Sequence, residues 1–271
     1  MRTTSRGCFK RQLTRLKISY QRARTYFRSP DVDYEVKLAY LRSLIAAHHP
    51  GEDAILFEDE VTYYNHPSTA ADHSPECLQP KAALAIGGEK SWRVAGALDI
   101  FSGEFVAVQR KAIRLETFVA FLRQIASKYP KTTTIYLVLD NWPVHFHPDV
   151  VDALEAQRCP YPFFRPASWK DLQPSGRYQG ENINIQLVPL PTYSPWLNPV
   201  EKVWKWLKQT IIHNHAYANN FKELKVKVEQ FLLEIANRAE ITLSIVGLKN
   251  PKGIFADQLR MAGYQFPEKY E

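Results

Sequence analysis

Hydrophobic and polar positions follow two periods along the chain, which predict short strands and amphipathic helices. The near-continuous apolar run at 134–140 (TIYLVLD) is typical of a central strand buried on both faces. Four further strands are expected at 54–59, 92–100, 104–112 and 185–190, with a hairpin turn between the second and the third. Helical spacing of apolar residues predicts helices at 9–20, 30–47, 115–129, 148–157, 198–212 and 221–236, and one more small element after them.

This order of elements predicts an α/β fold, in which a mixed five-stranded sheet carries helices on both faces. Residues 1–50 are expected to be a short helical and basic N-terminal stub and linker, 51–240 the main domain, and 241–271 a C-terminal tail. Within the main domain, residues 158–182 are rich in proline, glycine and aromatic residues, which indicates an inserted loop.

Length and composition are those of an ordinary globular protein, with 271 residues, 45% hydrophobic and 23% charged. They exclude a disordered chain, a collagen-like fibre and a small disulfide-stapled domain. The three cysteines, Cys8, Cys77 and Cys159, are scattered, so we expect no zinc finger and a reducing, cytoplasmic setting. No apolar run is long enough to cross a membrane and no secretory signal core is present, so no membrane partner is expected.

The positive charge is concentrated at the N-terminus. The net charge is +7, yet residues 1–28 hold nine basic side chains and no acid, whereas the other 26 basic and 28 acidic residues sum to −2. A basic arm of this kind suits a polyanion, most simply nucleic acid; a solvated tail is the equally weighted alternative.

Three acidic residues lie where functional sites of α/β folds are found. Asp59 and Asp140 each end a predicted buried strand, and Glu201 lies in the first turn of the helix that follows the last strand. If the two strands are neighbours, both carboxylates reach one divalent metal ion, and a third carboxylate can complete a two-metal site. Magnesium suits such a site because it takes oxygen ligands and leaves positions for water and phosphate.

Each acid also has a structural interpretation. Asp140 and Asn141 precede Pro143 and could form a turn, and Asp59 could pair with a basic neighbour. Asn198 is a good helix cap, and Glu201 three residues later completes a variant capping box. The chemical interpretation therefore depends on reading the three acids together with their flanking residues.

Those flanks form four motifs in a fixed order: FEDE at 57–60, GALDIFSGEF at 96–105, VLDNWPVH at 138–145 and LPTYSPWLNPVEKVW at 190–204. Together they resemble the DDE transposases of the mariner superfamily, particularly the bacterial insertion-sequence branch. The last motif is the most distinctive, and the resemblance spans roughly residues 10–236. It implies a ribonuclease-H-like catalytic domain, related to that of retroviral integrases, in which Asp59, Asp140 and Glu201 form the catalytic and metal-binding triad.

The resemblance also implies an activity and its partners. We expect two Mg²⁺ or Mn²⁺ ions per site and metal-dependent cleavage and strand transfer at the terminal inverted repeats of an insertion sequence. DNA ends and target DNA would be the partners, a homodimer would act in the DNA complex, and the setting would be the bacterial cytoplasm and nucleoid. A non-catalytic or truncated DNA-binding remnant and a ribonuclease-H-like nuclease remain the alternatives.

Two departures from the family pattern stand out. Sixty residues separate Asp140 from Glu201, more than the family usually has, and the excess matches the insertion at 158–182. Family members normally carry an N-terminal helix-turn-helix region, of which only residues 9–20 resemble a last helix. We therefore expect this region to be the end of a longer module. Two alternatives stay open: a truncated gene, or a separately encoded N-terminal half.

Several other residues are expected to support the site. Asn141 could orient Asp140 or cap the next turn, and Asn198 would support the site from the helix start. His145 could contact a phosphate or a carboxylate behind the site, and a helix-start hydrogen bond is the equally weighted alternative. Trp204 and Trp206 could stack on bases but are better explained as core residues at helical spacing. The DNA backbone is expected to contact six basic residues: Arg22, Arg24, Arg28, Lys202, Lys205 and Lys208.

Overall fold

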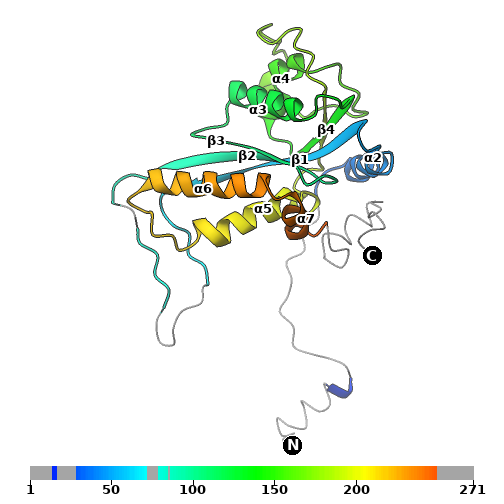
Figure 1. Cartoon of the computed structure of the whole chain (residues 1–271). Coiled ribbons are helices and arrows are strands. Elements are labelled where there is room, and N and C mark those ends of the chain that lie inside the picture. The colour runs from blue at the N-terminus through cyan, green and yellow to red at the C-terminus, as the bar shows by residue number, and fades with distance from the viewer. Residues whose placement is uncertain (1–13, 17–28, 72–78, 85, 249–271) are drawn as a thin grey trace, which may run out of the picture.

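The centre of the fold is a five-stranded sheet. A computed structural model describes residues 14–16, 29–71, 79–84 and 86–248, and its strands lie in the order β3-β2-β1-β4-β5 (Figure 1). The bounds are β1 (Asp53–Tyr64), β2 (Ser91–Asp99), β3 (Phe105–Arg110), β4 (Thr134–Leu139) and β5 (Ile185–Pro189). The first three strands pair antiparallel, whereas β1–β4 and β4–β5 are parallel. The predicted mixed sheet is confirmed.

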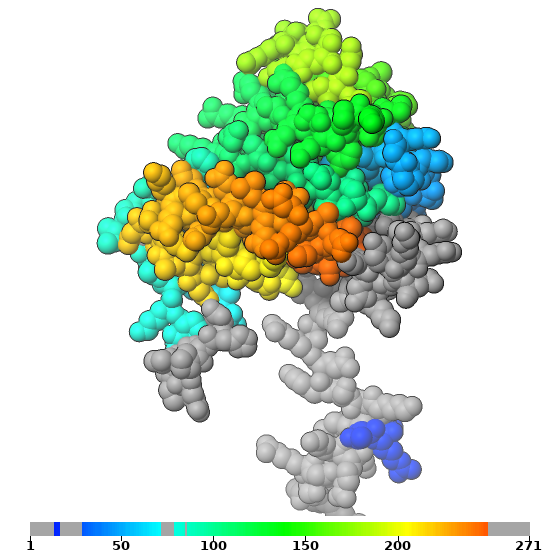
Figure 2. Space-filling model, in the orientation of Figure 1, coloured from blue at the N-terminus to red at the C-terminus, as the bar shows by residue number. Residues whose placement is uncertain are grey.

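Helices cover both faces of this sheet (Figure 1). One face carries α3 (Leu115–Lys128) and α4 (Pro148–Ala153). The other carries α5 (Val200–Leu207), α6 (Phe221–Ala236) and α7 (Ala239–Val246), and α2 (Tyr34–Ala46) packs into the same core. The helix α5 continues into a π-helical segment at Lys208–Ile212. In Figure 2, α5 and α6 form one continuous surface over their face of the molecule.

The strand β1 sends alternate side chains into two separate hydrophobic cores. Ile55 and Phe57 lie in the core under α5 and α6, and Leu56 lies in the core under α3. Because side chains alternate across a strand, Asp59 belongs to the α5 face, whereas its neighbours Glu58 and Glu60 belong to the α3 face. Asp59 is therefore separated by the sheet from the carboxylates of Glu58 and Glu60.

Several elements differ in extent from the expectation, β1 and α4 among them. The strand β1 continues to Tyr64 instead of ending at Asp59, because β2 pairs with it as far as Tyr64–Ser91. The helix expected at 148–157 ends at Ala153. Glu58, Asp59 and Glu60 lie inside β1, but three consecutive charged residues look like the end of a buried strand.

The stretch 158–182 contains only one short helical turn, at Ala167–Trp169, and packs onto α3 through side-chain pairs. Arg123 on α3 makes a bidentate ion pair with Glu181, at 2.6 and 2.8 Å. Phe163 stacks on Phe146 with ring centroids 4.9 Å apart. The stretch is thus irregular, as expected of an inserted loop, and it is attached to the α3 side. Within the described part of the chain, no helix has the length and apolar character needed to cross a bilayer.

Gly96 on β2 permits the close approach of α5 to the sheet. An added Cβ at this position would lie 2.7 Å from the ring of Phe105 and 2.7 Å from the ring of Trp204. Trp204 is buried on α5, three residues after Glu201, and Gly96 pairs with Asp59. Gly96 therefore helps to set the distance between the two acids.

We predict that Gly96→Ala lowers the free energy of unfolding by about 1–3 kcal/mol, because the new methyl group overpacks the contact between Trp204 and Phe105. Urea denaturation of the purified protein measures the change. Gly88→Ala is the matched control, since nothing lies within 4 Å of a Cβ added there. Equal effects of the two substitutions would contradict the prediction.

Candidate active site

Strand pairing brings Asp59 and Asp140 together. β1 and β4 run parallel, with Phe57 opposite Val138, and the same register continued by two residues places Asp59 opposite Asp140. Asp140 follows directly on the last residue of β4, as the sequence predicts. In a parallel pair, residues at matched positions point to the same face, so both carboxylates reach the α5 side at one edge of the sheet.

Glu201 joins them from the first turn of α5. Asn198 fixes this turn: its side chain donates to the backbone oxygen of Glu58 at 2.8 Å and accepts from the Val200 N–H at 3.1 Å. Asn198 is buried and connects β1 with the start of α5. It thus bonds to the first residue of α5 and ties the start of that helix to the strand of Asp59.

The three acids line one cavity of about 440 Å³. Asn141 and Trp142, which follow β4, form part of its wall, and the loop from Leu190 to Pro195 forms another. The Asn141 side chain donates to the Leu190 backbone oxygen at 2.7 Å and so connects these two walls. The structure therefore brings the predicted triad together at a pocket large enough for a nucleotide fragment.

Carboxyl groups are concentrated in this cavity, and their charged forms are disfavoured there. Burial raises the pKa of Asp59 to about 8, and Glu201, Glu60 and Asp140 add to the rise by repulsion. The pKa of Glu201 is also raised, chiefly by desolvation and further by Asp140, although Lys208 opposes the shift. The carboxylates thus lack enough positive charge nearby to neutralise them, as is typical of a cation site.

Asp140 has a different environment, because His145 supports it. The His145 Nδ1 atom lies 3.3 Å from the Asp140 carboxylate, which also accepts from the Trp142 N–H at 2.8 Å. Burial alone would raise the pKa of Asp140, but the hydrogen bond and charge of His145 hold it below its usual value. His145 is fully buried and therefore holds Asp140 from behind the pocket.

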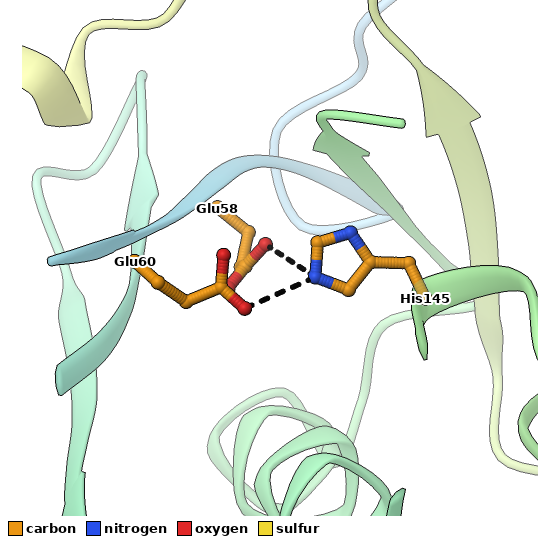
Figure 3. Close-up of side chains that lie close together, drawn as sticks. All are labelled: Glu58, Glu60 and His145. Carbon is orange, nitrogen blue, oxygen red and sulfur yellow. Dashed lines mark hydrogen bonds and ion pairs between the residues drawn. The ribbon is translucent and has the colours of Figure 1, made fainter. Parts of the chain in front are cut away.

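His145 also faces two carboxylates on the α3 side of the sheet (Figure 3). Its Nε2 atom lies 3.2 Å from Glu60 and 3.6 Å from Glu58, and its ring packs on Phe118. Glu58 is fully buried, and neither of its carboxylate oxygens has a hydrogen-bond partner. Burial and Glu60 raise the pKa of Glu58, and although burial lowers that of His145, the two glutamates raise it well above its usual value.

Glu58 and Glu60 are neighbours of the site that were not expected from the sequence. The available signal was the FEDE string, since two acids two residues apart on a strand point to the same face. Among the described residues, Glu58, Glu60 and His145 offer ligand atoms within 4.8 Å of one another. Because His145 already serves these acids as a buried cation, the cluster is explained without a metal ion.

The pocket acids fit a metal better. Asp59, Asp140 and Glu201 offer carboxylate oxygens only, which are the ligands that Mg²⁺ and Mn²⁺ take. Their repulsion is relieved by a divalent cation, and they face an open cavity through which water and a phosphate can enter. The donor set and the charge therefore match the metal site expected from the sequence.

The basic residues predicted to contact DNA differ in their exposure and in their partners. Lys202 donates to the Val246 backbone oxygen at 2.8 Å, at the end of α7, whereas Lys205 is exposed. Lys208 is half-buried, and its charge acts on Glu201. Arg22, Arg24 and Arg28 lie outside the described residues.

The two tryptophans of α5 are packed. Trp204 is buried against Phe105, and Trp206 packs on Phe231 with ring centroids 4.9 Å apart. Trp204 is only 1% exposed and is therefore a core residue, as expected. Trp206 is partly buried.

We predict that His145→Ala lowers the free energy of unfolding by about 3–5 kcal/mol, because it leaves the buried Glu58 and the partly buried Glu60 without a cation. Adding Glu58→Gln should recover part of this loss, since the amide carries no charge. Urea denaturation of wild type, both single variants and the double variant at pH 7 measures the coupling. A double variant no more stable than His145→Ala would contradict the prediction.

Comparisons with known proteins agree with this geometry. Residues 54–225 match a family model described as DDE superfamily endonuclease. The chain is 28% identical over 229 residues to the insertion element IS630 uncharacterized 39 kDa protein of Shigella sonnei; the match covers 83% of this chain. The chain spans only 58% of that relative's length.

Solved structures share the fold. The crystal structure of the mariner Mos1 paired end complex with Mg matches with a TM-score of 0.58 at 13% identity, covering 97% of this chain and 72% of that one. The corresponding complex with Mn matches with a TM-score of 0.51 at 14% identity, covering 90% of this chain and 71% of that one. At this identity the likeness shows the ribonuclease-H-like fold. The family match spans most of the chain, and the protein belongs to the DDE superfamily endonucleases.

Proposed function

We propose that this protein is a transposase that cleaves DNA at the terminal inverted repeats of an insertion sequence and joins the freed ends to target DNA. The observation that carries the proposal is the convergence of Asp59, Asp140 and Glu201 on one cavity, where burial and the other two acids raise the pKa of Asp59. The relative from an insertion element and the fold shared with a paired end complex support the choice of transposition over other DDE chemistry.

The roles of the acids follow from the resemblance. Asp140, which is held by His145, would contact both of two Mg²⁺ or Mn²⁺ ions, and Asp59 and Glu201 would each hold one. Bound ions of this kind neutralise the attacking and leaving oxygens of a phosphodiester and lower the pKa of a water molecule. Asn141 and Asn198 hold the walls that carry the acids.

Partners follow from the same proposal. Joining two ends of one element calls for two active sites, so we propose a homodimer on DNA. Lys205 and Lys208 beside the pocket, with Arg22, Arg24 and Arg28 before the described domain, supply positive charge for the phosphate backbone. A separately encoded helix-turn-helix half would read the terminal repeat, and the complex would act on the bacterial nucleoid.

We predict that wild-type protein nicks duplex DNA carrying the terminal repeats of its element in Mg²⁺ or Mn²⁺, and that Asp140→Asn reduces the rate at least 100-fold, because the bridging carboxylate loses its charge. Denaturing gels of end-labelled DNA measure the cleavage. Asp171→Asn is the matched control, because Asp171 is exposed and does not line the pocket.

Other outcomes of this assay select the alternatives. Equal nicking by Asp140→Asn and wild type would overturn the proposed site. Binding without cleavage would favour a DNA-binding remnant, and cleavage without preference for the repeats would favour a general ribonuclease-H-like nuclease.

Metal binding can be measured through thermal stability, without an assay of activity. Asp59→Asn should raise the melting temperature in metal-free buffer, because Asp59 is desolvated and repelled by Glu201 and Asp140. Added Mn²⁺ should raise the melting temperature of wild type but not of this variant, since a ligand that binds only the folded state stabilises it by about 2.7 kcal/mol at 100 times its Kd. Differential scanning calorimetry measures both effects, and an equal response of the two proteins to Mn²⁺ would contradict the assignment.

A further inference from the structure

The two edges of the sheet differ in how they are covered. At β5, the Gln157 side chain donates to the Ile185 backbone oxygen at 2.9 Å and accepts from the Leu187 N–H at 2.8 Å. The Tyr161 hydroxyl donates to the Pro189 backbone oxygen at 3.3 Å. Side chains of the protein itself thus occupy the place of a further strand at this edge, whereas β3 forms the opposite edge.

Every second residue of β3 turns its backbone groups away from β2. The Asp99 N–H donates to the Glu104 oxygen at 2.9 Å, so the residues that bond to β2 alternate along β3, starting from Glu104. The backbone groups of Ala107 and Gln109 therefore point outward, and both residues are partly exposed. Among the described residues, the Arg110 guanidinium contacts the Gln109 oxygen at 2.8 Å, and no hydrogen bond reaches the other outward groups. This edge therefore presents both N–H donors and C=O acceptors to a further strand.

β3 lies between α3 and α6 (Figure 1), and a cavity of about 610 Å³, the β3 groove, opens along it. The wall of this groove on α6 includes Val226 and Leu233, which are 43% and 58% exposed although they are apolar. Gln124 and Lys128 of α3 line the groove from the other side of the sheet. A strand added to β3 would therefore lie between two helices and cover the two apolar side chains.

Positive charge surrounds the β3 groove. Four basic residues line it: Arg110, Lys128, Lys222 and Lys225. Among the described residues of its lining, the one acid is Glu229. Lys128 pairs with Glu104 at 3.3 Å, but the other three make no ion pair with any described residue. Lys225 lies over the ring of Trp92, 4.2 Å from its centroid, and is thereby held at the groove. An occupant with carboxylates would complement this charge.

The backbone groups of β3 select a polypeptide over a nucleic acid. A phosphate oxygen only accepts hydrogen bonds, so a DNA backbone would leave the outward carbonyl groups of β3 without donors. An extended polypeptide supplies N–H and C=O groups in alternation and pairs with both. A second copy of this protein would bring the same basic residues to the groove, and like charges would repel.

We propose that the β3 groove binds an extended, acidic segment of another protein, which adds a further strand to the sheet beside β3. Apolar side chains of this segment cover Val226 and Leu233, and its carboxylates lie beside the basic residues of the groove. The inference does not depend on the proposed function, because the groove and the active-site cavity share no lining residue.

The test uses a synthetic peptide. A fluorescently labelled peptide of about seven residues, with glutamate and valine in alternation, is titrated with the purified protein, and fluorescence anisotropy measures binding. Wild type should bind this peptide. It should not bind the same peptide with lysine in place of glutamate, because the charges repel. It should not bind a form with methylated backbone nitrogens either, because that form cannot donate to β3.

Two variants and a matched control locate the site. Lys222→Glu should weaken binding about 5- to 30-fold, since an attraction becomes a repulsion. Ala107→Pro removes an outward N–H from an edge strand, where proline is tolerated, and should weaken binding about 10-fold or more. Lys227→Glu makes the same charge change on the same helix, but Lys227 lines another cavity, beside His213, so binding should be unchanged.

Other outcomes overturn the proposal. If wild type binds no peptide at millimolar concentration, the lysines only shield the edge. Equal binding of the methylated peptide, or equal binding by wild type and Lys222→Glu, would place the peptide elsewhere. Duplex DNA that binds in place of the peptide and is weakened by Lys222→Glu would make the groove a DNA contact, and a DNA-free dimer that Ala107→Pro separates would assign it to a second copy. If Ala107→Pro does not fold, as its melting temperature would show, Lys222→Glu and the methylated peptide decide.

Discussion

The parallel pairing of β1 with β4 is the constraint on which the site depends. It places Asp59 and Asp140 side by side at one edge of the sheet, although like charges at this distance repel and both lose solvation. The hydrophobic cores on the two faces of the sheet supply the stability that holds them there. Glu201 adds to the repulsion, and Asn198 and the close contact of Trp204 at Gly96 keep its helix against the sheet.

The two faces of β1 handle charge in opposite ways. On the α3 face, His145 lies within ion-pair distance of Glu58 and Glu60, so the buried acids there have a cation of the chain's own. On the α5 face, Asp59 has no comparable partner among the contacts described, and its charge is left to be neutralised from outside. His145 belongs to both arrangements, because its other ring nitrogen contacts Asp140. The acids of the α3 face thus have a cation of the chain's own, whereas on the α5 face Asp59 has none among the contacts described.

Much of this could be predicted from the sequence, for identifiable reasons. The apolar run TIYLVLD identified a central strand, and helical spacing gave α6 its bounds, Phe221–Ala236, without error. Asp59 and Asp140 could be chosen because each follows buried strand residues, and both line the cavity as expected. The extension of β1 to Tyr64 could not be seen, because Glu58 and Glu60 look like surface residues until His145 is known to lie opposite them. The left-handed backbone of Tyr193, on the wall of the cavity, gave no signal, since no glycine or asparagine marks it.

The attachment of Thr192, on the cavity wall, to Ser29 and Asp31 has a consequence for protein engineering. The Ser29 hydroxyl donates to the Thr192 backbone oxygen at 2.6 Å, and the Thr192 N–H donates to the Asp31 carboxylate at 2.8 Å. Ser29, Asp31 and α2 all precede the strand-rich part of the chain. Ser29 and Asp31 nevertheless hold the cavity wall, and α2 contributes side chains to the hydrophobic core on the α5 face. A chimera that grafts a foreign DNA-reading module onto this endonuclease should therefore be joined before Ser29. A junction placed after α2, at the first strand, would remove Ser29 and Asp31. The loop of Thr192 would then lose the hydrogen bonds that hold it at the cavity.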